Sequence, residues 1–524
     1  MRNIFFFVLL AAFTPLGAQE KAPENWFNLS YQTEKVRGVQ TERTYNELIK
    51  DKKGKTVIVA VIDGGIDNNH EDLKDMMWKN PGEIADNKID DDKNGYIDDV
   101  YGWNFLGNQK GENIRYEQTE FTRLYKKLKP KYDGKLLIDV PATSRMEFEL
   151  YEKVRGEYNK QLTDMKKNKV LLDTIVALVN DIKAQRKTDS ATFADFKAYQ
   201  PSDAFKKLHF ALKIGIKDEK TWNEAIKEIK TGKEQIDASI NHHLNLDFNP
   251  RSLVGDDPEN PNERYYGNND VKGPDALHGT HVAGIIAASR NNNIGIKGVA
   301  ADVRIMAIRA VPDGDERDKD IANAIRYAVD NGAQIINMSF GKSYGTHKEA
   351  VDEAVKYAES KGVLLVHAAG NDGKNNDNTD NFPSDTYKGG GSPNNWIEVG
   401  ALSWKDGKRA VAPFSNYGKT EVDVFAPGVA INSCKTNGGY TEQSGTSMAS
   451  PVCTGVCAVL KAYYPDLTPA QIKTIIENSS DKSLAKKKVI TPGTKKKKIK
   501  FGKLCKTGGF VNLYEAFKLA ETTK

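Results

Sequence analysis

Short runs of consecutive apolar residues recur along the chain, and longer stretches with helical spacing separate them. Continuous apolar runs of about four to eight residues are typical of strands that are buried on both faces of a parallel sheet. On this basis we predict strands at Thr56–Ile62, Val303–Ile308, Gln334–Phe340, Val363–Ala368 and Trp396–Val399.

Amphipathic stretches alternate with these runs, for example at Asp320–Asn331 and Lys348–Ser360. Gly332 and Gly362 follow the two stretches, at the positions where helix C-caps are expected. Alternation of strands and helices predicts an α/β fold with a mostly parallel central sheet and helices on both faces. The chemistry of such a sheet is expected at the carboxyl ends of its strands.

The pattern changes between residues 111 and 251, where Lys, Glu and Asp become frequent. An apolar stripe at three-, four- and seven-residue spacing indicates one face of a long helix. The stripe consists of Val154, Tyr158, Leu162, Met165, Leu172, Ile175, Val179 and Ile182. A second helical region is predicted over Phe205–Ile240. We interpret the segment as a helical insertion, which is either a functional unit or a spacer.

Length and charge add two constraints. The 524 residues, of which 39% are hydrophobic, allow one large α/β domain with an insertion. The net charge of +5 is small for this length, so the total charge does not indicate a nucleic-acid partner.

The cysteines indicate packing more than cross-linking. Four are present, at Cys434, Cys453, Cys457 and Cys505. Cys453 and Cys457 fall one helical turn apart, a spacing that is common for core packing. We therefore expect buried free thiols, in preference to disulfides or a metal site.

The first residues have the pattern of an export signal. Arg2 supplies a positive start, Ile4–Phe13 is a short apolar run, and Leu16–Ala18 ends in small residues suited to cleavage after Ala18. The alternative is an uncleaved membrane anchor, but the apolar run is short for a bilayer span. We expect an exported protein, located in the periplasm, at the cell surface or outside the cell, without stable membrane insertion after cleavage.

Two segments rich in small residues contain an aspartate and a histidine in notable positions. In Val59–Asp67 an apolar strand ends at Asp63 and two glycines follow, so a buried carboxylate can be aimed at a partner. In His278–Gly284, His278 falls near the start of a helix. Each segment has another reading, because Asp63 could cap a helix or bind a metal, and His278 with His281 could bind a metal.

A third segment, Gly445–Pro451, places Ser447 at the start of a helix predicted over Ser447–Tyr463. The positive end of the helix then lies beside the serine hydroxyl and backbone N–H. Taken alone, this serine could be a simple N-cap.

Together, in the chain order Asp, His, Ser, the three segments resemble the signature motifs of the subtilase family of serine proteases. The resemblance covers about Thr56–Phe105 and Ser252–Phe517. It implies a subtilisin-like three-layer α/β fold and a secreted serine endopeptidase that works through an acyl-enzyme intermediate. On the matching positions, Ser447 is the nucleophile, His278 is the general base and then acid, and Asp63 orients the imidazole.

The same resemblance assigns further residues. His281 is the second histidine of its motif and is not the base, and Asn371 matches the family's oxyanion-hole asparagine, which acts with the backbone N–H of Ser447. Two segments match the family's substrate-binding walls, one by strand addition to an extended peptide and both by lining a side-chain pocket. They consist of Ser339, Phe340 and Gly341, and of Ala368, Ala369 and Gly370.

The resemblance also implies the partners. Polypeptide substrates are expected, with no cofactor required for the chemistry and no nucleic acid. A monomer is expected, although the sequence does not determine the oligomeric state.

An acidic loop after the Asp63 motif has part of a calcium-binding pattern. Asp90, Asp92 and Asn94 occupy positions one, three and five, with Gly95 at position six, as in the first half of an EF-hand loop. Position twelve is Tyr101 and not Glu, so the EF-hand is incomplete. The loop is either a structural calcium site or a solvated acidic turn.

We therefore expect five segments. They are a signal peptide at 1–18, an N-terminal arm at 19–50, a first catalytic part at 51–110, the helical insertion at 111–251 and a second catalytic part at 252–524. The arm is short for the inhibitory prodomain usual in subtilases. The alternative function is not enzymatic: a binding or scaffold protein that keeps the same fold without catalysis. An α/β-hydrolase esterase is disfavoured, because Ser447 lies in Gly-Thr-Ser-Met-Ala and the order of the triad differs.

Overall fold

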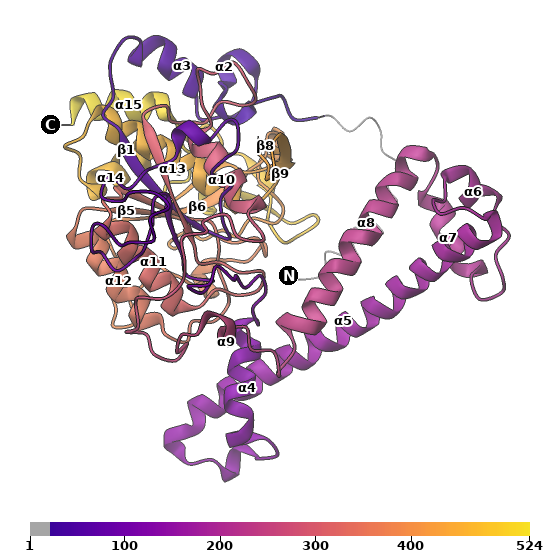
Figure 1. Ribbon diagram of the computed structural model, residues 1–524. Helices are drawn as coiled ribbons and strands as arrows, with labels where there is room; N and C mark the ends of the chain where they lie inside the picture. The colour runs from indigo at the N-terminus through magenta and orange to yellow at the C-terminus, as the bar shows by residue number, and fades with distance from the viewer. Residues whose placement is uncertain (1–20, 524) are drawn as a thin grey trace. The chain divides into compact units, whose positions relative to one another are not determined.

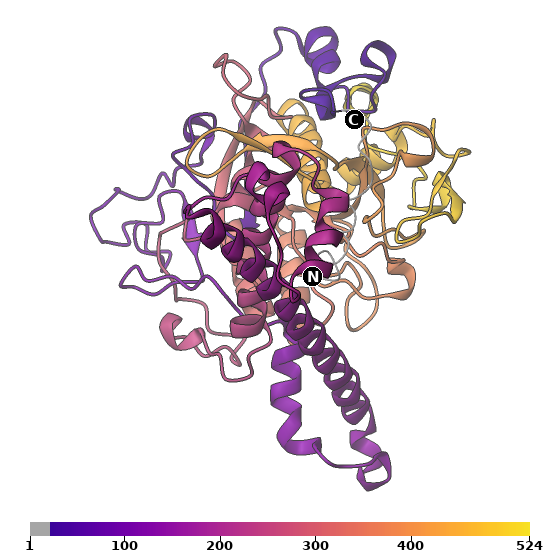
Figure 2. The same cartoon turned by 90° about the vertical axis from the view of Figure 1, so that its right-hand side faces the viewer.

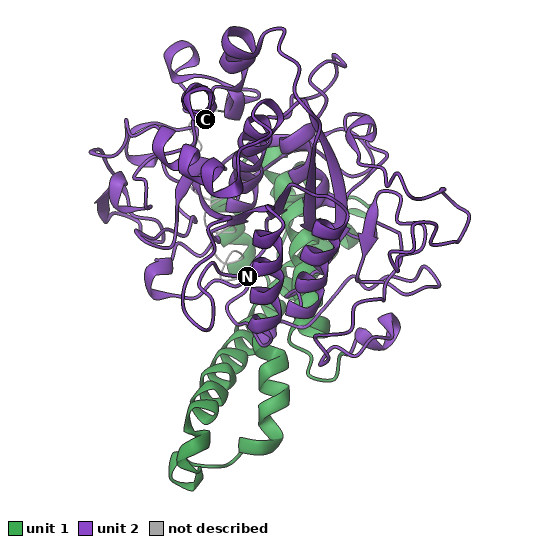
Figure 3. Cartoon of the chain, turned by 90° about the vertical axis from the view of Figure 1, so that its left-hand side faces the viewer, with its two compact units in different colours: residues 1–21, 121–248 green, residues 22–120, 249–524 purple. Residues whose placement is uncertain are grey.

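The computed structural model describes residues 21–523, so the expected signal peptide lies outside the described residues. The chain divides into two compact units (Figure 3). Unit 1 contains Phe121–Phe248, and unit 2 contains Ala22–Glu120 and Asn249–Lys524. Residues 111–120 and 249–251, which we had assigned to the insertion, thus belong to unit 2.

Unit 2 is built on a seven-stranded sheet with the strand order β2-β3-β1-β4-β5-β6-β7 (Figure 1). All neighbouring strands in this sheet are parallel, which confirms the predicted α/β fold class. The strands are β1 (Val57–Asp63), β2 (Gly102–Asn104), β3 (Val303–Arg309), β4 (Ile335–Met338), β5 (Leu364–Ala368), β6 (Trp396–Leu402) and β7 (Val424–Pro427).

Helices cover both faces of the sheet and complete a three-layer architecture. Val59 and Val61 of β1 pack into one core together with α10 (Leu277–Ala287) and α13 (Thr446–Tyr463). The alternate residues, Ala60 and Ile62, pack into a second core with α11 (Asp318–Asp330) and α12 (Lys348–Ser360). Successive side chains of a strand point to opposite faces, so a continuous apolar run supplies both cores.

The remaining regular elements of unit 2 are short or peripheral. Gly332 and Gly362 end α11 and α12 with φ of 80° and 71°, as predicted for C-caps. Two antiparallel hairpins lie outside the main sheet. These elements are the hairpin of β8 (Ile431–Cys434) and β9 (Tyr440–Gln443), the hairpin of β10 (Lys488–Ile490) and β11 (Lys498–Lys500), and the helices α2 (Tyr31–Glu34), α3 (Thr41–Thr44), α9 (Arg251–Val254), α14 (Pro469–Ser479) and α15 (Leu513–Thr522).

The N-terminal arm is an integral part of unit 2. Trp26 and Phe27 are fully buried in the core that also contains α10 and α13. The indole N–H of Trp26 donates to the carbonyls of Val429 at 3.1 Å and Ala430 at 3.2 Å. These hydrogen bonds fix the arm to the loop before β8.

Unit 1 is helical and contains one very long helix. Its elements are α4 (Glu120–Tyr132), α5 (Arg145–Arg186), α6 (Phe193–Ala198), α7 (Lys206–Gly215) and α8 (Glu219–Ala238). The helix α4 and the first part of α5 run side by side, with Tyr132 in ring contact with Phe148 and Tyr151 (Figures 1 and 2). The second predicted helical region is interrupted, because Asp218 caps α8 by accepting the Thr221 N–H at 2.8 Å.

The four cysteines are free and buried, as predicted. Cys453 and Cys457 both lie on α13, within the core. Across residues 21–523, no helix is long and apolar enough to cross a membrane.

Candidate active site

Asp63 and His278 form a close pair at the carboxyl edge of the sheet. Asp63 is the last residue of β1 and is only 3% exposed. His278 lies in the first turn of α10, and its Nδ1 is 2.9 Å from both carboxylate oxygens of Asp63. A Cβ at Gly279 would lie 3.1 Å from the Asp63 carboxyl carbon and 2.3 Å from the Gly65 carbonyl oxygen. Glycine at this position therefore allows α10 to approach the strand end.

The protonation of His278 follows from this pairing. Burial acts to lower the pKa of the ring, but the charge of Asp63 and its hydrogen bond outweigh burial and hold the pKa above its ordinary value of 6.5. The Asp63 carboxylate can only accept at Nδ1, so Nδ1 carries the proton and Nε2 is left for proton exchange.

His281, one turn further along α10, has a different environment. It is wholly buried, and its Nε2 donates to the carbonyls of Ile431 at 3.1 Å and Thr441 at 3.0 Å. Burial lowers its pKa to about 4. This histidine is therefore neutral at ordinary pH and links α10 to the β8–β9 hairpin.

Ser447 is held at the start of α13 by a reciprocal contact with Ser339. The Ser447 hydroxyl donates to the Ser339 carbonyl at 3.0 Å, and the Ser339 hydroxyl donates to the Ser447 carbonyl at 3.0 Å. Among the described residues, the hydroxyl of Ser447 is thus bonded to Ser339 and not to His278. Rotation about one side-chain torsion redirects such a hydroxyl.

Asn371 lies next to the first residue of the same helix, although the two are 75 positions apart in the sequence. Its Oδ1 accepts the Thr446 N–H at 2.8 Å, which leaves the amide nitrogen of Asn371 as a donor. A Cβ at Gly445 would lie 3.7 Å from that nitrogen and 3.5 Å from the backbone nitrogen of Ser447. Two N–H donors therefore border one small space beside Gly445, the arrangement that an oxyanion requires.

The two predicted substrate-binding segments lie at neighbouring strand ends. Ser339–Gly341 directly follows β4, while Ala368–Gly370 ends and follows β5, and Met338 pairs with His367 between these strands. Gly370 has a φ of 102°, and its N–H donates to the Thr446 hydroxyl at 3.1 Å. The second segment is thereby fixed to the start of α13.

Asn381 is a residue of this region that sequence reasoning missed. Its amide nitrogen lies 3.4 Å from the carbonyl of Ala368 and 3.3 Å from that of Ala369. Its Oδ1 would lie 2.8 Å from a Cβ at Gly341. Asn381 therefore stands between the two segments, but it lies in a loop whose sequence has no motif to single it out.

Comparison with known proteins decides the family. Residues 54–501 match the Subtilase family, Peptidase S8. The chain belongs to the subtilase family. The resemblance stated from the motifs is thus confirmed over most of the chain.

Individual subtilases match about two fifths of this chain. The thermophilic serine proteinase of Bacillus sp. (strain AK1) is 44% identical over 206 residues, which are 39% of this chain and 47% of that protein. Thermitase of Thermoactinomyces vulgaris is 39% identical over 206 residues, which are 39% of this chain and 67% of thermitase. Subtilisin DY of Bacillus licheniformis is 36% identical over 205 residues, which are 39% of this chain and 70% of that protein. The chain spans about half the length of the first of these relatives.

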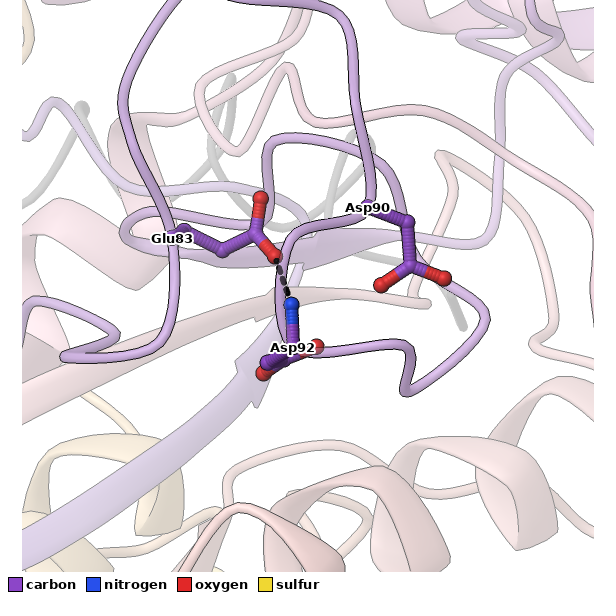
Figure 4. A group of neighbouring side chains, drawn as sticks. All are labelled: Glu83, Asp90 and Asp92. Atoms are coloured by element: carbon purple, nitrogen blue, oxygen red, sulfur yellow. Dashed lines mark hydrogen bonds between the residues drawn. The ribbon is translucent and has the colours of Figure 1, made fainter.

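This subtilase also has an acidic group in the predicted calcium loop. Carboxylate oxygens of Glu83, Asp90 and Asp92 all lie within 4.8 Å of one another (Figure 4). Glu83, which the sequence pattern did not include, accepts the backbone N–H of Asp92 at 3.2 Å. Burial raises the pKa of Glu83. Three hard carboxylate oxygen donors at this spacing fit a calcium ion.

Asn94 is engaged within the loop instead. Its Oδ1 accepts the Tyr96 N–H at 2.8 Å, and its Nδ2 donates to Asp92 at 3.1 Å and Asp99 at 3.0 Å. The oxygens of Asp90 likewise accept the N–H groups of Asn94 and Gly95. The structure thus groups Asp90 and Asp92 with Glu83, and the carboxylates also serve the turn itself.

Proposed function

We propose that this subtilase is a serine endopeptidase that hydrolyses peptide bonds of polypeptides through an acyl-enzyme intermediate. Membership of the family supports hydrolytic chemistry of this kind. The observation that carries the proposal is the bond from His278 Nδ1 to the buried Asp63, together with the position of Ser447 in the first turn of α13. That pairing leaves one imidazole nitrogen available for proton exchange with a serine at a positive helix end.

The proposed reaction uses the groups in two steps. Ser447 Oγ attacks the scissile carbonyl carbon while His278 Nε2 takes its proton, and Asp63 stabilises the resulting imidazolium. The carbonyl oxygen becomes an oxyanion that accepts from the Ser447 N–H and from Asn371 Nδ2. His278 then gives its proton to the leaving amine. Water attacks the acyl-enzyme in the same manner, which releases the carboxylic acid and restores Ser447.

Substrate binding in this proposal uses the two segments at the ends of β4 and β5. An extended peptide adds along Ser339–Gly341, and the side chain before the scissile bond lies between this segment and Ala368–Gly370. The chemistry requires no cofactor.

The acidic loop is proposed as a structural calcium site. The carboxylates of Glu83, Asp90 and Asp92 would hold the ion, with Asn94 shaping the turn through its bonds to Tyr96 and Asp92. A bound calcium ion would supply positive charge to three clustered carboxylates and so stabilise the loop.

We also propose that the protein is exported and that its helical insertion is separate from the catalytic unit. The charged start, apolar run and small-residue end of residues 1–18 support export. The separation of Phe121–Phe248 as a compact unit supports a helical insertion that takes no direct part in the chemistry.

The test of the proposed function is labelling with a fluorophosphonate, which reacts with activated serines. Labelling of the purified protein at Ser447, together with cleavage of a denatured protein substrate, is expected. Ser447→Ala should show neither, with an unchanged circular dichroism spectrum. A protein that is folded but neither labels nor cleaves would instead be the non-catalytic scaffold.

A further inference from the structure

A second histidine–carboxylate pair contacts the proposed peptide-binding segment at Phe340. His367 of β5 is wholly buried, and its Nδ1 lies 2.9 Å and 3.0 Å from the two carboxylate oxygens of Glu398 on β6. Its other ring nitrogen, Nε2, lies 2.8 Å from the carbonyl oxygen of Phe340. The mechanism proposed above uses neither residue.

The geometry defines the protonation of this ring. Both partners, a carboxylate and a carbonyl, can only accept, so both nitrogens of His367 must carry protons. The resulting imidazolium is balanced by Glu398, which also accepts the indole N–H of Trp396 at 2.9 Å. Burial acts to lower the pKa of His367, but the charge of Glu398 outweighs burial and raises it. A buried ion pair is costly unless its hydrogen bonds are met, and here they are.

The bond to Phe340 lies where the regular ladder of the sheet stops. Strands β4 and β5 pair as far as Met338 and His367. Two residues after Met338, the side chain of His367 supplies the donor for the Phe340 carbonyl that a backbone N–H would supply within the ladder. Backbone groups alternate in direction along an extended chain, so the carbonyls of Ser339 and Gly341 face away from β5. In agreement, the Ser339 carbonyl accepts from Ser447.

The far end of the segment is anchored independently. The backbone of Lys342 exchanges hydrogen bonds with Phe382 at 2.9 Å and 2.8 Å. Its buried ammonium group lies 3.0 Å from Glu120 and 2.7 Å from Asp318. Met338 and Lys342, on either side of Ser339–Gly341, are therefore both fixed by bonds of their own. His367 fixes the central residue, Phe340, by a hydrogen bond to its carbonyl.

We propose that His367 and Glu398 are positioning residues that hold the peptide-binding segment by the Phe340 carbonyl and so present the backbone groups of Ser339 and Gly341 to the substrate. The inference rests on the proposed function, since it assumes that a peptide binds along this segment. It predicts that the pair acts on the binding of extended substrates and has little effect on the reactivity of Ser447.

Two double variants isolate the hydrogen bond to Phe340. In His367→Gln with Glu398→Gln, the buried charges are removed together, and the glutamine amide can still donate from near the Nε2 position. In His367→Leu with Glu398→Gln, the same charges are removed and the donor is lost as well. The second variant should raise KM for a tetrapeptide substrate about tenfold over the first, the scale of one lost hydrogen bond.

Two short reagents separate positioning from general damage. Both variants should hydrolyse a single-residue ester, and react with a fluorophosphonate, within about twofold of each other. Equal KM values of the two variants for the tetrapeptide would overturn the proposal. So would a loss on the single-residue ester as large as the loss on the tetrapeptide.

Nuclear magnetic resonance of the full chain tests the geometry in a protein that keeps both His367 and Glu398. In ¹⁵N-histidine-labelled Ser447→Ala protein at pH 7, both ring nitrogens of His367 should have the shifts of protonated nitrogens. Loss of the signal in the His367→Gln double variant assigns it. A His367 ring whose Nε2 carries no proton would refute the positioning pair, because it could not donate to the Phe340 carbonyl. If the unmodified protein cleaves neither substrate, the proposed function fails, whereas this spectrum still decides the pairing.

Discussion

Asp63 and Ser339 directly follow Ile62 and Met338, two residues that pair across the adjacent parallel strands β1 and β4. Asp63 binds the imidazole of His278, and Ser339 binds the hydroxyl of Ser447. The register of two strands therefore sets where the proposed base and nucleophile lie. Asn337, inside β4, adds to this alignment by accepting from Ser450 at 3.0 Å and Thr454 at 2.9 Å of α13.

Replacement of Asp63 by Asn should change both the rate and the pH profile. Catalysis needs neutral His278, so kcat/KM should rise as pH increases through the pKa of this ring. Asp63 raises that pKa, and its loss should move the rising limb to lower pH. Turnover should fall about 10⁴-fold, because an amide no longer enforces the Nδ1–H tautomer.

Asp275→Asn is the matched control for this pH shift. Asp275 also raises the pKa of His278 through its charge, but among residues 21–523 the hydrogen bonds of that ring are with Asp63 alone. A smaller shift in the same direction is expected, with turnover nearly retained. If the rising limb of the pH profile does not move in Asp63→Asn, measured over about pH 5–9 where a histidine titrates, the pairing is contradicted.

The two histidines of α10 should differ sharply on substitution. His278→Ala should lower turnover by roughly 10⁶-fold, the scale for loss of the base in subtilisin, a member of this family. His281→Ala should keep turnover within about tenfold but lower the melting temperature, because the donors to Ile431 and Thr441 are lost. Rates per titrated active site, with melting curves, make the comparison. The reverse ranking would exchange the assignments.

Substitution of Asn371 should lower turnover with little change in KM. Loss of one oxyanion donor lowers turnover by about 10²–10³-fold, a scale known from subtilisin itself. In Asn371→Asp the side chain can still accept from the Thr446 N–H, whereas Asn371→Ala loses this bond too. Both variants should lose turnover, and the alanine variant should also melt lower. A fully active Asn371→Ala would remove this residue from the oxyanion site.

Chelation should lower the melting temperature more than it lowers turnover at moderate temperature. An ion that binds only the folded chain stabilises it by mass action, by about 2.7 kcal/mol at one hundred times its Kd. Asp92→Ala and Glu83→Gln should abolish the response to chelator. Asp86→Asn is the control, since Asp86 is in the same loop but outside the carboxylate group. A melting curve that excess chelator leaves unchanged would show a solvated acidic turn.

Deletion of the helical insertion should be tolerated only if it is confined to Phe121–Phe248. Replacement of Phe121–Phe248 by a flexible linker should leave cleavage of a small peptide within a few fold, with the effect confined to large protein substrates. Removal of residues 111–251 should instead destabilise the protein. It takes away Glu117 and Glu120, whose carboxylates pair with Arg317 at 2.8 Å and Lys342 at 3.0 Å. Equal loss on peptide and protein substrates by the folded 121–248 variant would make the insertion part of the catalytic unit.

Sequence patterns predicted the elements whose burial is continuous. The apolar runs of β1, β3 and β5 were found to within about two residues, because both faces of each strand are buried. The strands Gly102–Asn104 and Val424–Pro427 were missed, since each is too short to show a pattern. Tertiary contacts, and not local propensity, define such edge strands.

The candidate site divides in the same way. The proposed triad, Asn371 and the two proposed binding segments lie in local motifs that resemble a known family. Glu83 lies outside the spacing of the calcium pattern, and the pair of His367 and Glu398 joins residues 31 positions apart. Only the fold brings such partners together, so one sequence read alone contains no sign of them.

The N-terminal arm has a consequence for synthesis. Trp26 donates to Val429, 403 residues further along the chain, and the Val39 carbonyl accepts the Leu513 N–H at 2.9 Å. A growing chain makes the arm long before its partners leave the ribosome. The buried surface of Trp26 and Phe27 must wait until translation of the catalytic unit is almost complete. The core of unit 2 that contains the arm can therefore be completed only after α15 has been made.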